Sequence, residues 1–134
     1  MQVYKFGGAS IANPERMRQL MPVIVSAEKP LVLVVSAYGK TTNALEAVVW
    51  DLLAGKKKAA MEKILVLEKA HSDYASTLLS EKGYQALKER LNEYYTELQW
   101  ALDDVSGKTK DYIYDQIVCM GELLSTVIFS AFLK

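Results

Sequence analysis

The sequence has 134 residues, of which 51% are hydrophobic and 24% charged, and its 16 basic residues balance its 16 acidic ones. This composition fits one soluble globular domain, and the balanced charge argues against a partner that needs a basic surface, so we expect neither nucleic-acid nor membrane binding. A single cysteine, Cys119, cannot form an internal disulfide, which fits a reducing cytoplasm. The first residues lack the apolar core of a signal peptide, so a cytoplasmic protein is expected.

The first informative stretch is a short β-prone run, residues 3–6, that leads directly into Gly7 and Gly8. A helix is predicted to follow, with Asn13 as its N-cap. Strand, glycine turn and helix form a layout that binds phosphate, because glycine amides can face an anion without an intervening Cβ. Lys5 adds a full positive charge at the strand end. The alternative is a tight turn after an edge strand, with Lys5 in solvent.

A helix is predicted through residues 17–24, where apolar side chains recur at helical spacing, and Pro22 should kink or end it. The run Leu31–Val35 is continuously apolar, which predicts a strand buried on both faces of a parallel sheet. These elements together predict one β–α–β unit.

A polar loop, residues 36–43, follows the second strand. Its Gly39-Lys40-Thr41 imitates the end of a P-loop, but Val34 occupies the position of the first required glycine, so a P-loop is excluded. Thr41 or Thr42 is predicted to cap the next helix.

Three further helices are predicted before residue 106. The first covers residues 45–53 and ends at Gly55. The next two, residues 61–78 and 84–105, are separated at Gly83 and form an antiparallel hairpin. Within them Trp50 and Trp100 are expected to be core or hairpin anchors. His71 is expected to be packed or on the surface, because no second ligand lies near it to complete a metal site.

The last predicted helix covers residues 111–134. Its segment 117–133 is too short and too polar for a comfortable membrane span, so it is interpreted as a core helix. Gly121 and Glu122 are unexpected there, because glycine weakens a helix and a buried carboxylate needs a partner. The alternative is a helix end that reaches solvent at Glu122.

Three stretches resemble the motifs of the aspartate kinases, in the amino-acid kinase superfamily: Lys5–Ser10, Ser36-Ala37 followed by Thr42-Asn43, and Gly121–Ser125. Two departures from the family pattern occur. Cys119 replaces the usual Ser or Thr, and Lys40 stands where many relatives have glycine. Because of this shift, the choice between Thr41 and Thr42 stays open.

The resemblance implies an α/β fold, a three-layer α/β/α sandwich of the amino-acid kinase (carbamate kinase-like) type. Residues 1–134 would be the helix-rich N-terminal part of a single, incomplete kinase domain, with the nucleotide-binding half and regulatory domains lying beyond Lys134. The implied activity transfers the γ-phosphoryl group of ATP, as its Mg²⁺ complex, to the β-carboxylate of L-aspartate. That reaction begins lysine, threonine and methionine biosynthesis. No metal ligand is identified, and the chain alone is expected to be inactive and to form homo-oligomers.

The resemblance also assigns roles to residues of this chain. The catalytic residue would be Lys5. The nucleotide and phosphate site would comprise Lys5, Phe6, Gly7, Gly8 and Ser10, and the substrate site would comprise Ser36, Thr42 and Glu122.

Two alternatives remain open. One is a sibling kinase that acts on glutamate, acetylglutamate or a nucleoside monophosphate. The other is a non-catalytic helical interaction module in which the glycine turn is only structural.

Overall fold

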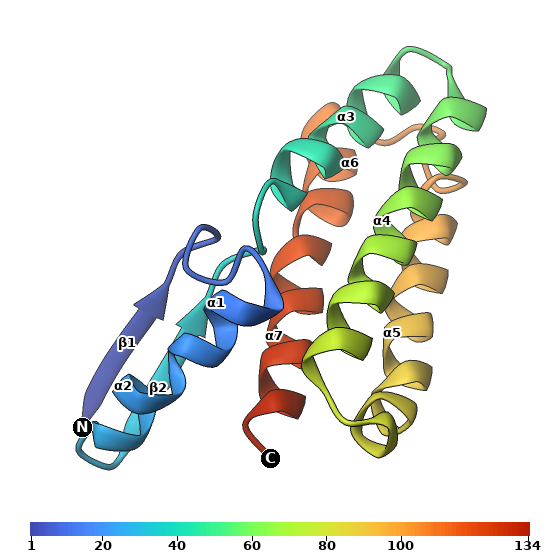
Figure 1. The fold of residues 1–134 in the computed structure, drawn as a ribbon. Helices are drawn as coiled ribbons and strands as arrows, with labels where there is room; N and C mark the ends of the chain where they lie inside the picture. The colour runs from blue at the N-terminus through green and yellow to red at the C-terminus, as the bar shows by residue number, and fades with distance from the viewer.

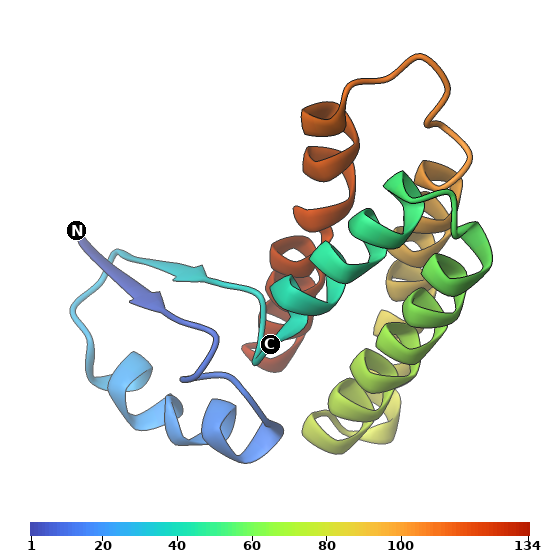
Figure 2. The same cartoon turned by 90° about the horizontal axis from the view of Figure 1, so that it is seen from above.

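The computed structural model describes residues 1–134, which form a small parallel sheet beside a group of long helices (Figure 1). The first part is a β–α–β unit: β1 (Gln2–Phe6), α1 (Pro14–Gln19), α2 (Met21–Ser26) and β2 (Leu31–Val35). The remainder is helical: α3 (Thr41–Leu53), α4 (Lys57–Leu78), α5 (Glu81–Ala101), α6 (Lys110–Val118) and α7 (Met120–Phe132). Figure 2 shows the β–α–β unit lying to one side of the long helices.

Both predicted strands are confirmed. They pair in parallel, with Gln2 opposite Leu31 and Phe6 opposite Val35. The predicted helix between them is interrupted, as expected. The break lies before Pro22, at Leu20, because a proline is tolerated only in the first turn of a new helix.

The sheet has one covered and one bare face. Side chains alternate along both strands, and those on one face, such as Phe6 and Val35, pack against the hydrophobic core. The other face carries Val3, which is 59% exposed, and Val32 and Val34, which are each 44% exposed. The prediction that β2 is buried on both faces is therefore wrong within these residues, because no second layer of helices covers this face.

The predicted antiparallel hairpin is confirmed by α4 and α5, which pack side by side. Its break is not at Gly83. The chain turns at Leu79 and Ser80, and the Ser80 hydroxyl accepts the Gly83 N–H at 3.1 Å, so Gly83 lies in the first turn of α5.

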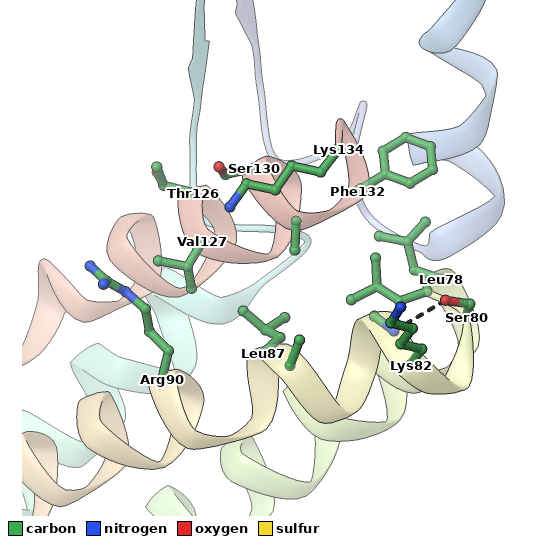
Figure 3. A pocket seen from close by; sticks show the side chains of 14 residues that line it. Leu78, Ser80, Lys82, Leu87, Arg90, Thr126, Val127, Ser130, Phe132 and Lys134 are labelled. Atoms are coloured by element: carbon green, nitrogen blue, oxygen red, sulfur yellow. Dashed lines mark hydrogen bonds between the residues drawn. The ribbon is translucent and has the colours of Figure 1, made fainter.

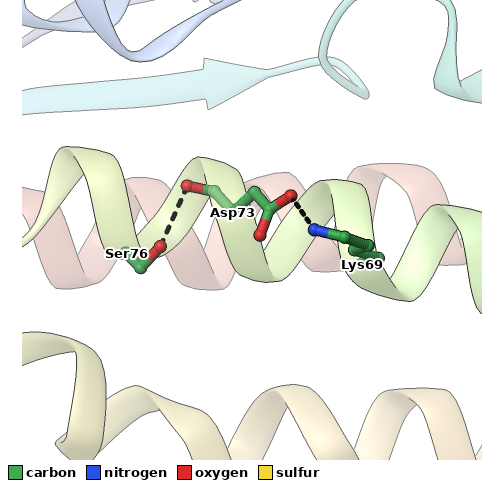
Figure 4. A network of polar contacts seen from close by, with 3 residues as sticks. All are labelled: Lys69, Asp73 and Ser76. Atoms are coloured by element: carbon green, nitrogen blue, oxygen red, sulfur yellow. Dashed lines mark hydrogen bonds and ion pairs between the residues drawn. The ribbon is translucent and has the colours of Figure 1, made fainter.

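Part of the exposed face of α4 is polar. Lys69 and Asp73 form an ion pair at 2.6 Å one turn apart, and the Ser76 hydroxyl donates to the Asp73 carbonyl (Figure 4). Both charged side chains are exposed, so the pair contributes a few tenths of a kcal/mol at most, about 0.3–0.5.

The final helix is divided rather than continuous. α6 ends at Val118 and α7 begins at Met120, with Cys119 between them. By length and composition alone, Lys110–Phe132 is apolar enough to cross a membrane. However, Ile117 and Ile128 are fully buried in the hydrophobic core, which confirms the interpretation as a core helix.

The two tryptophans are not core anchors, contrary to the prediction. Trp50 is 46% and Trp100 is 67% exposed. The Lys110 ammonium lies 4.8 Å from the Trp50 ring centroid, a cation–π contact at the protein surface.

The bare sheet face predicts that the 134-residue chain self-associates. Burial of a few hundred Å² of apolar surface would contribute several kcal/mol, at ~25 cal/mol per Å², before the costs of association. Replacing Val32 and Val34 together by Thr should shift the equilibrium toward monomer, as measured by light scattering over a dilution series. Val66→Thr on α4, at another exposed valine, is the control. Equal association of both variants would contradict this prediction.

Candidate active site

The ends of β1 and β2 bring the first two sequence motifs together. Because the strands are parallel, their carboxyl ends meet at the same edge of the sheet. The Ser36 N–H donates to the Phe6 carbonyl at 3.1 Å, and the Gly39 N–H donates to the Gly8 carbonyl at 3.0 Å. Two backbone hydrogen bonds thus join the glycine loop (residues 7–13), which follows β1, to the second loop (residues 36–40), which follows β2.

Gly8 is required by close packing of these two loops. A Cβ on Gly8 would lie 2.6 Å from the Ala37 carbonyl oxygen and 3.1 Å from that of Gly39. Gly39 itself has φ of +55°, a left-handed conformation that favours glycine. Gly39 therefore forms the turn of this loop, one position before the glycine of the family pattern, where this chain has Lys40.

The third motif lies on α7 and packs against the second loop at Ala37. A Cβ on Gly121 would lie 2.8 Å from the Ala37 Cβ and 3.3 Å from the Leu45 Cδ1, so no larger residue fits. The Ser125 hydroxyl donates to the Ser36 carbonyl at 2.7 Å. The three motifs therefore meet around Ala37, whose side chain is buried. This packing explains why a glycine occurs within an apolar helix.

Gly7 differs from Gly8. Nothing lies within 4 Å of a Cβ built on Gly7, and its φ is not positive, so neither packing nor backbone conformation requires glycine there. The backbone at this position is open to a ligand. Ser10 beside it is exposed, and its N–H donates to the Gly7 carbonyl at 3.0 Å.

Lys5 is exposed on β1 and forms no ion pair in the chain, so its charge is available to an anion. The side chain of Phe6 points the other way and meets the Phe129 ring edge-on, with centroids 6.1 Å apart. Phe6 thus contributes to the loop through its backbone carbonyl rather than its ring.

The predicted N-cap of the first helix is confirmed, since the Asn13 side chain accepts the Arg16 N–H at 2.9 Å. The Arg16 guanidinium also donates to the Ala9 carbonyl at 2.8 Å, which ties the glycine loop to α1. Because α1 has only six residues, its dipole adds little to the site. Arg16 therefore adds a second positive charge beside the loop that follows Lys5.

The structure distinguishes the two threonines. Thr41 is buried and its hydroxyl donates to the Tyr38 carbonyl at 2.7 Å, whereas the Thr42 hydroxyl is half-buried and has no partner within the chain. The prediction that one of them caps α3 is wrong, because Lys40 occupies the cap position and no side-chain cap bond forms. Ser36 is half-buried, and its backbone is fully engaged with its neighbours.

Glu122 lies in the first turn of α7, next to the Gly121 contact, and its side chain is exposed. No cation of the chain pairs with it. A carboxylate at a helix N-terminus is favoured by the helix dipole. The alternative from the sequence, that the helix reaches solvent at Glu122, therefore describes the side chain correctly, and the acid is free to meet an ammonium group.

Sequence reasoning missed the residues that support these loops. His71 and Tyr74 of α4 lie beneath the second loop, with ring centroids 4.6 Å and 4.4 Å from the Tyr38 ring. Both occur at core positions of a regular helical pattern, so nothing in the sequence separates them from ordinary packing residues.

His71 is fully buried and neutral. Its Nδ1 lies 2.8 Å from the Leu67 carbonyl, which can only accept, so Nδ1 carries the proton. Nε2 is buried without a partner. Burial lowers the pKa of His71 to about 4, although the bond to Leu67 acts in the opposite direction.

The largest hollow of the surface lies elsewhere. A groove of about 800 Å³ runs between α5 and α7, lined by Leu87 and Arg90 of α5 and by Val127 of α7 (Figure 3). It contains none of the residues predicted for the site. The candidate site is instead an open edge, at which the strand ends, the second loop and the start of α7 converge. Such a gathering of polar loops at the carboxyl edge of a parallel sheet defines the α/β class of ligand-binding domains.

Comparison with known proteins agrees with this class. A model of the amino acid kinase family matches residues 1–134, and the chain belongs to this family. The chain is 32% identical to aspartokinase 1, chloroplastic, and 34% identical to aspartokinase 2, chloroplastic, both from Arabidopsis thaliana. Each match covers 98% of this chain but only 23% and 24% of the relative, so the chain spans about a quarter of their length.

Solved structures show the same fold. Escherichia coli aspartokinase III, in complex with aspartate and ADP, superposes with a TM-score of 0.82 at 24% identity, over 99% of this chain and 28% of that one. The complex with lysine and aspartate gives a TM-score of 0.81. The fold expected from the resemblance, part of an amino-acid kinase α/β/α sandwich, is therefore confirmed.

The two glycines should respond differently to substitution. Gly8→Ala should destabilise the chain by roughly 1–3 kcal/mol, because its Cβ overlaps the Ala37 carbonyl. Gly7→Ala should leave stability within about 0.5 kcal/mol, because its Cβ meets nothing. Urea denaturation of both variants measures the difference. Equal losses would show that the two loops pack differently from this arrangement.

The buried imidazole predicts a pH dependence of stability. The pKa of His71 is about 4 when folded and near 6.5 when unfolded, so the unfolded chain binds more protons between these values. The contribution of neutral His71 to the free energy of unfolding is fully present above pH ~6.5, and it should fall by roughly 3 kcal/mol as the pH drops to ~4. His71→Asn, which keeps a donor for Leu67 but does not titrate, should lose less stability between pH 7 and 5. Identical pH profiles in urea denaturation would contradict a neutral His71.

Proposed function

We propose that this chain is part of an aspartate kinase, which transfers the γ-phosphoryl group of ATP to the β-carboxylate of L-aspartate. The observation that carries the proposal is the meeting of three motifs around Ala37, which gathers a free cation, an open glycine backbone and a free acid at one edge of the sheet. The aspartokinase relatives, and the neighbouring structure that contains aspartate and ADP, support this substrate pair.

In the proposed reaction, an oxygen of the substrate carboxylate attacks the γ-phosphorus and the bond to the β-phosphate oxygen breaks, which releases ADP and an acyl phosphate. Such transfer depends on alignment and on charge neutralisation. Lys5 would neutralise the charge of the transferred group, and the Gly7 backbone, which is open to a ligand, would hold phosphoryl oxygens with Ser10 nearby.

The substrate amino acid would be held by the other two motifs. Thr42 has an unpaired hydroxyl, unlike Thr41, and lies in the first turn of α3, which follows the loop that contains Ser36. Glu122 has an unpaired carboxylate that suits the α-ammonium group. Within the chain no three His, Cys, Asp or Glu side chains gather as a metal site. In this proposal Mg²⁺ enters as part of the ATP complex. A cytoplasmic, homo-oligomeric enzyme is part of the same proposal.

The test is kinetic, in a protein that carries this chain at the length of its relatives. Lys5→Ala should lower kcat on the order of 100-fold, because the lost charge acts mainly as the phosphoryl group moves. Glu122→Gln should instead raise KM for aspartate roughly tenfold and leave KM for ATP unchanged, since it removes an ion-pair partner of the ammonium group.

Lys58→Ala, at an exposed lysine in α4, is the matched control and should leave both constants unchanged. Glutamate and acetylglutamate should be offered beside aspartate. Turnover of either in place of aspartate would assign the site to a sibling kinase, and no turnover of any acid would favour the interaction module.

A further inference from the structure

One side chain of α4 contacts both loops of the candidate site. The Tyr74 hydroxyl donates to the carbonyl of Ile11, at the end of the glycine loop, at 2.7 Å. The Tyr74 ring packs on the Tyr38 ring of the second loop, with centroids 4.4 Å apart and planes inclined at 30°. Ile11 and Tyr74 are both buried, so these contacts are shielded from water.

Tyr38 connects Tyr74 to the start of α3. Its carbonyl accepts the Thr41 hydroxyl at 2.7 Å and the Thr41 N–H at 3.2 Å, so the Tyr38 backbone fixes the start of α3. Thr42, which we assign to substrate binding, is the next residue. Tyr74 is therefore linked to Tyr38 by a ring contact, and Tyr38 is linked by two hydrogen bonds to Thr41, which precedes Thr42 in the chain.

His71 supports Tyr38 from the same helix. Its ring lies 4.6 Å from the Tyr38 ring and 6.0 Å from the Tyr95 ring, so the imidazole fills the space between them. Its Nδ1 is held by the Leu67 carbonyl, which fixes the ring orientation. Tyr38, His71 and Tyr74 thus form a packed cluster beneath the second loop.

We propose that Tyr74, which packs on Tyr38 beside His71, is a positioning residue that sets the distance between the glycine loop and the second loop. This inference rests on the proposed function, since the loops bind phosphate and amino acid only in that case. Phosphoryl transfer is sensitive to the alignment of the reacting atoms, so loops that move independently should slow the chemical step more than they weaken binding.

Tyr74→Phe removes only the hydroxyl that holds Ile11. Tyr95→Phe is the matched control, because Tyr95 is equally buried but its hydroxyl bonds to the Leu67 carbonyl, within α4, at 3.4 Å. Amide hydrogen exchange of the 134-residue chain is measured by NMR. In Tyr74→Phe, the loop amides of Ser10 and Gly39 should exchange at least tenfold faster, while amides of α5 keep their rates.

In Tyr95→Phe the loop amides should change no more than those of the helices. Equal loop rates in the two variants would overturn the proposal. Should Tyr74→Phe not fold, Tyr38→Leu tests the same path from the other side, and it should speed exchange at Gly39 more than at Ser10. The opposite order, or no change, would also overturn the proposal.

The kinetic arm uses the longer protein described above. Tyr74→Phe should lower kcat at least tenfold with KM for ATP and aspartate changed less than threefold, and Tyr95→Phe should retain the original kcat. A Tyr74→Phe enzyme with unchanged kcat would overturn the positioning role. If the unmodified protein does not phosphorylate aspartate, the proposed function fails, but the exchange comparison still decides whether Tyr74 joins the loops.

Discussion

The backbone at Ala37 passes between two glycines, and the rest of the site depends on this close packing. Gly8 admits the Ala37 carbonyl from one side, and Gly121 admits its Cβ from the other. Approach at this distance is stable because the polar groups around it are paired: the Ser36 carbonyl accepts the Ser125 hydroxyl and the Gly8 carbonyl accepts the Gly39 amide. Segments that are far apart in the chain are thereby held at fixed spacing.

The groups available to a ligand surround this packed point without belonging to it. Lys5 and Glu122 are exposed and lack ion-pair partners, and a Cβ built on Gly7 would meet no other atoms of the chain. The packed glycines set the distances, and the free groups supply the charge. Such a division suits phosphoryl transfer, which depends on alignment and neutralisation more than on covalent chemistry by the protein.

The helices provide the rigid support for these loops. Tyr74 and His71 come from α4, whose apolar side packs on α3 and α5, so the support is continuous with the hydrophobic core. His71 beneath Tyr38 is neutral because a charged imidazole there would be buried without a counter-ion, which would destabilise this support. Stability and the geometry of the site therefore depend on the same cluster.

The sequence by itself determined the strands, the extent of most helices and the three motifs, because periodicity, the Asn13 cap and glycine placement are local properties. It also indicated Lys5 and Glu122, since a charged residue beside glycines is visible in the chain. Only the tertiary structure decided that Gly8 and Gly121 are packing residues whereas Gly7 is open, that Thr41 is engaged while Thr42 is free, and that Tyr74 joins the two loops. Those distinctions arise from contacts between segments distant in sequence, which no local pattern encodes.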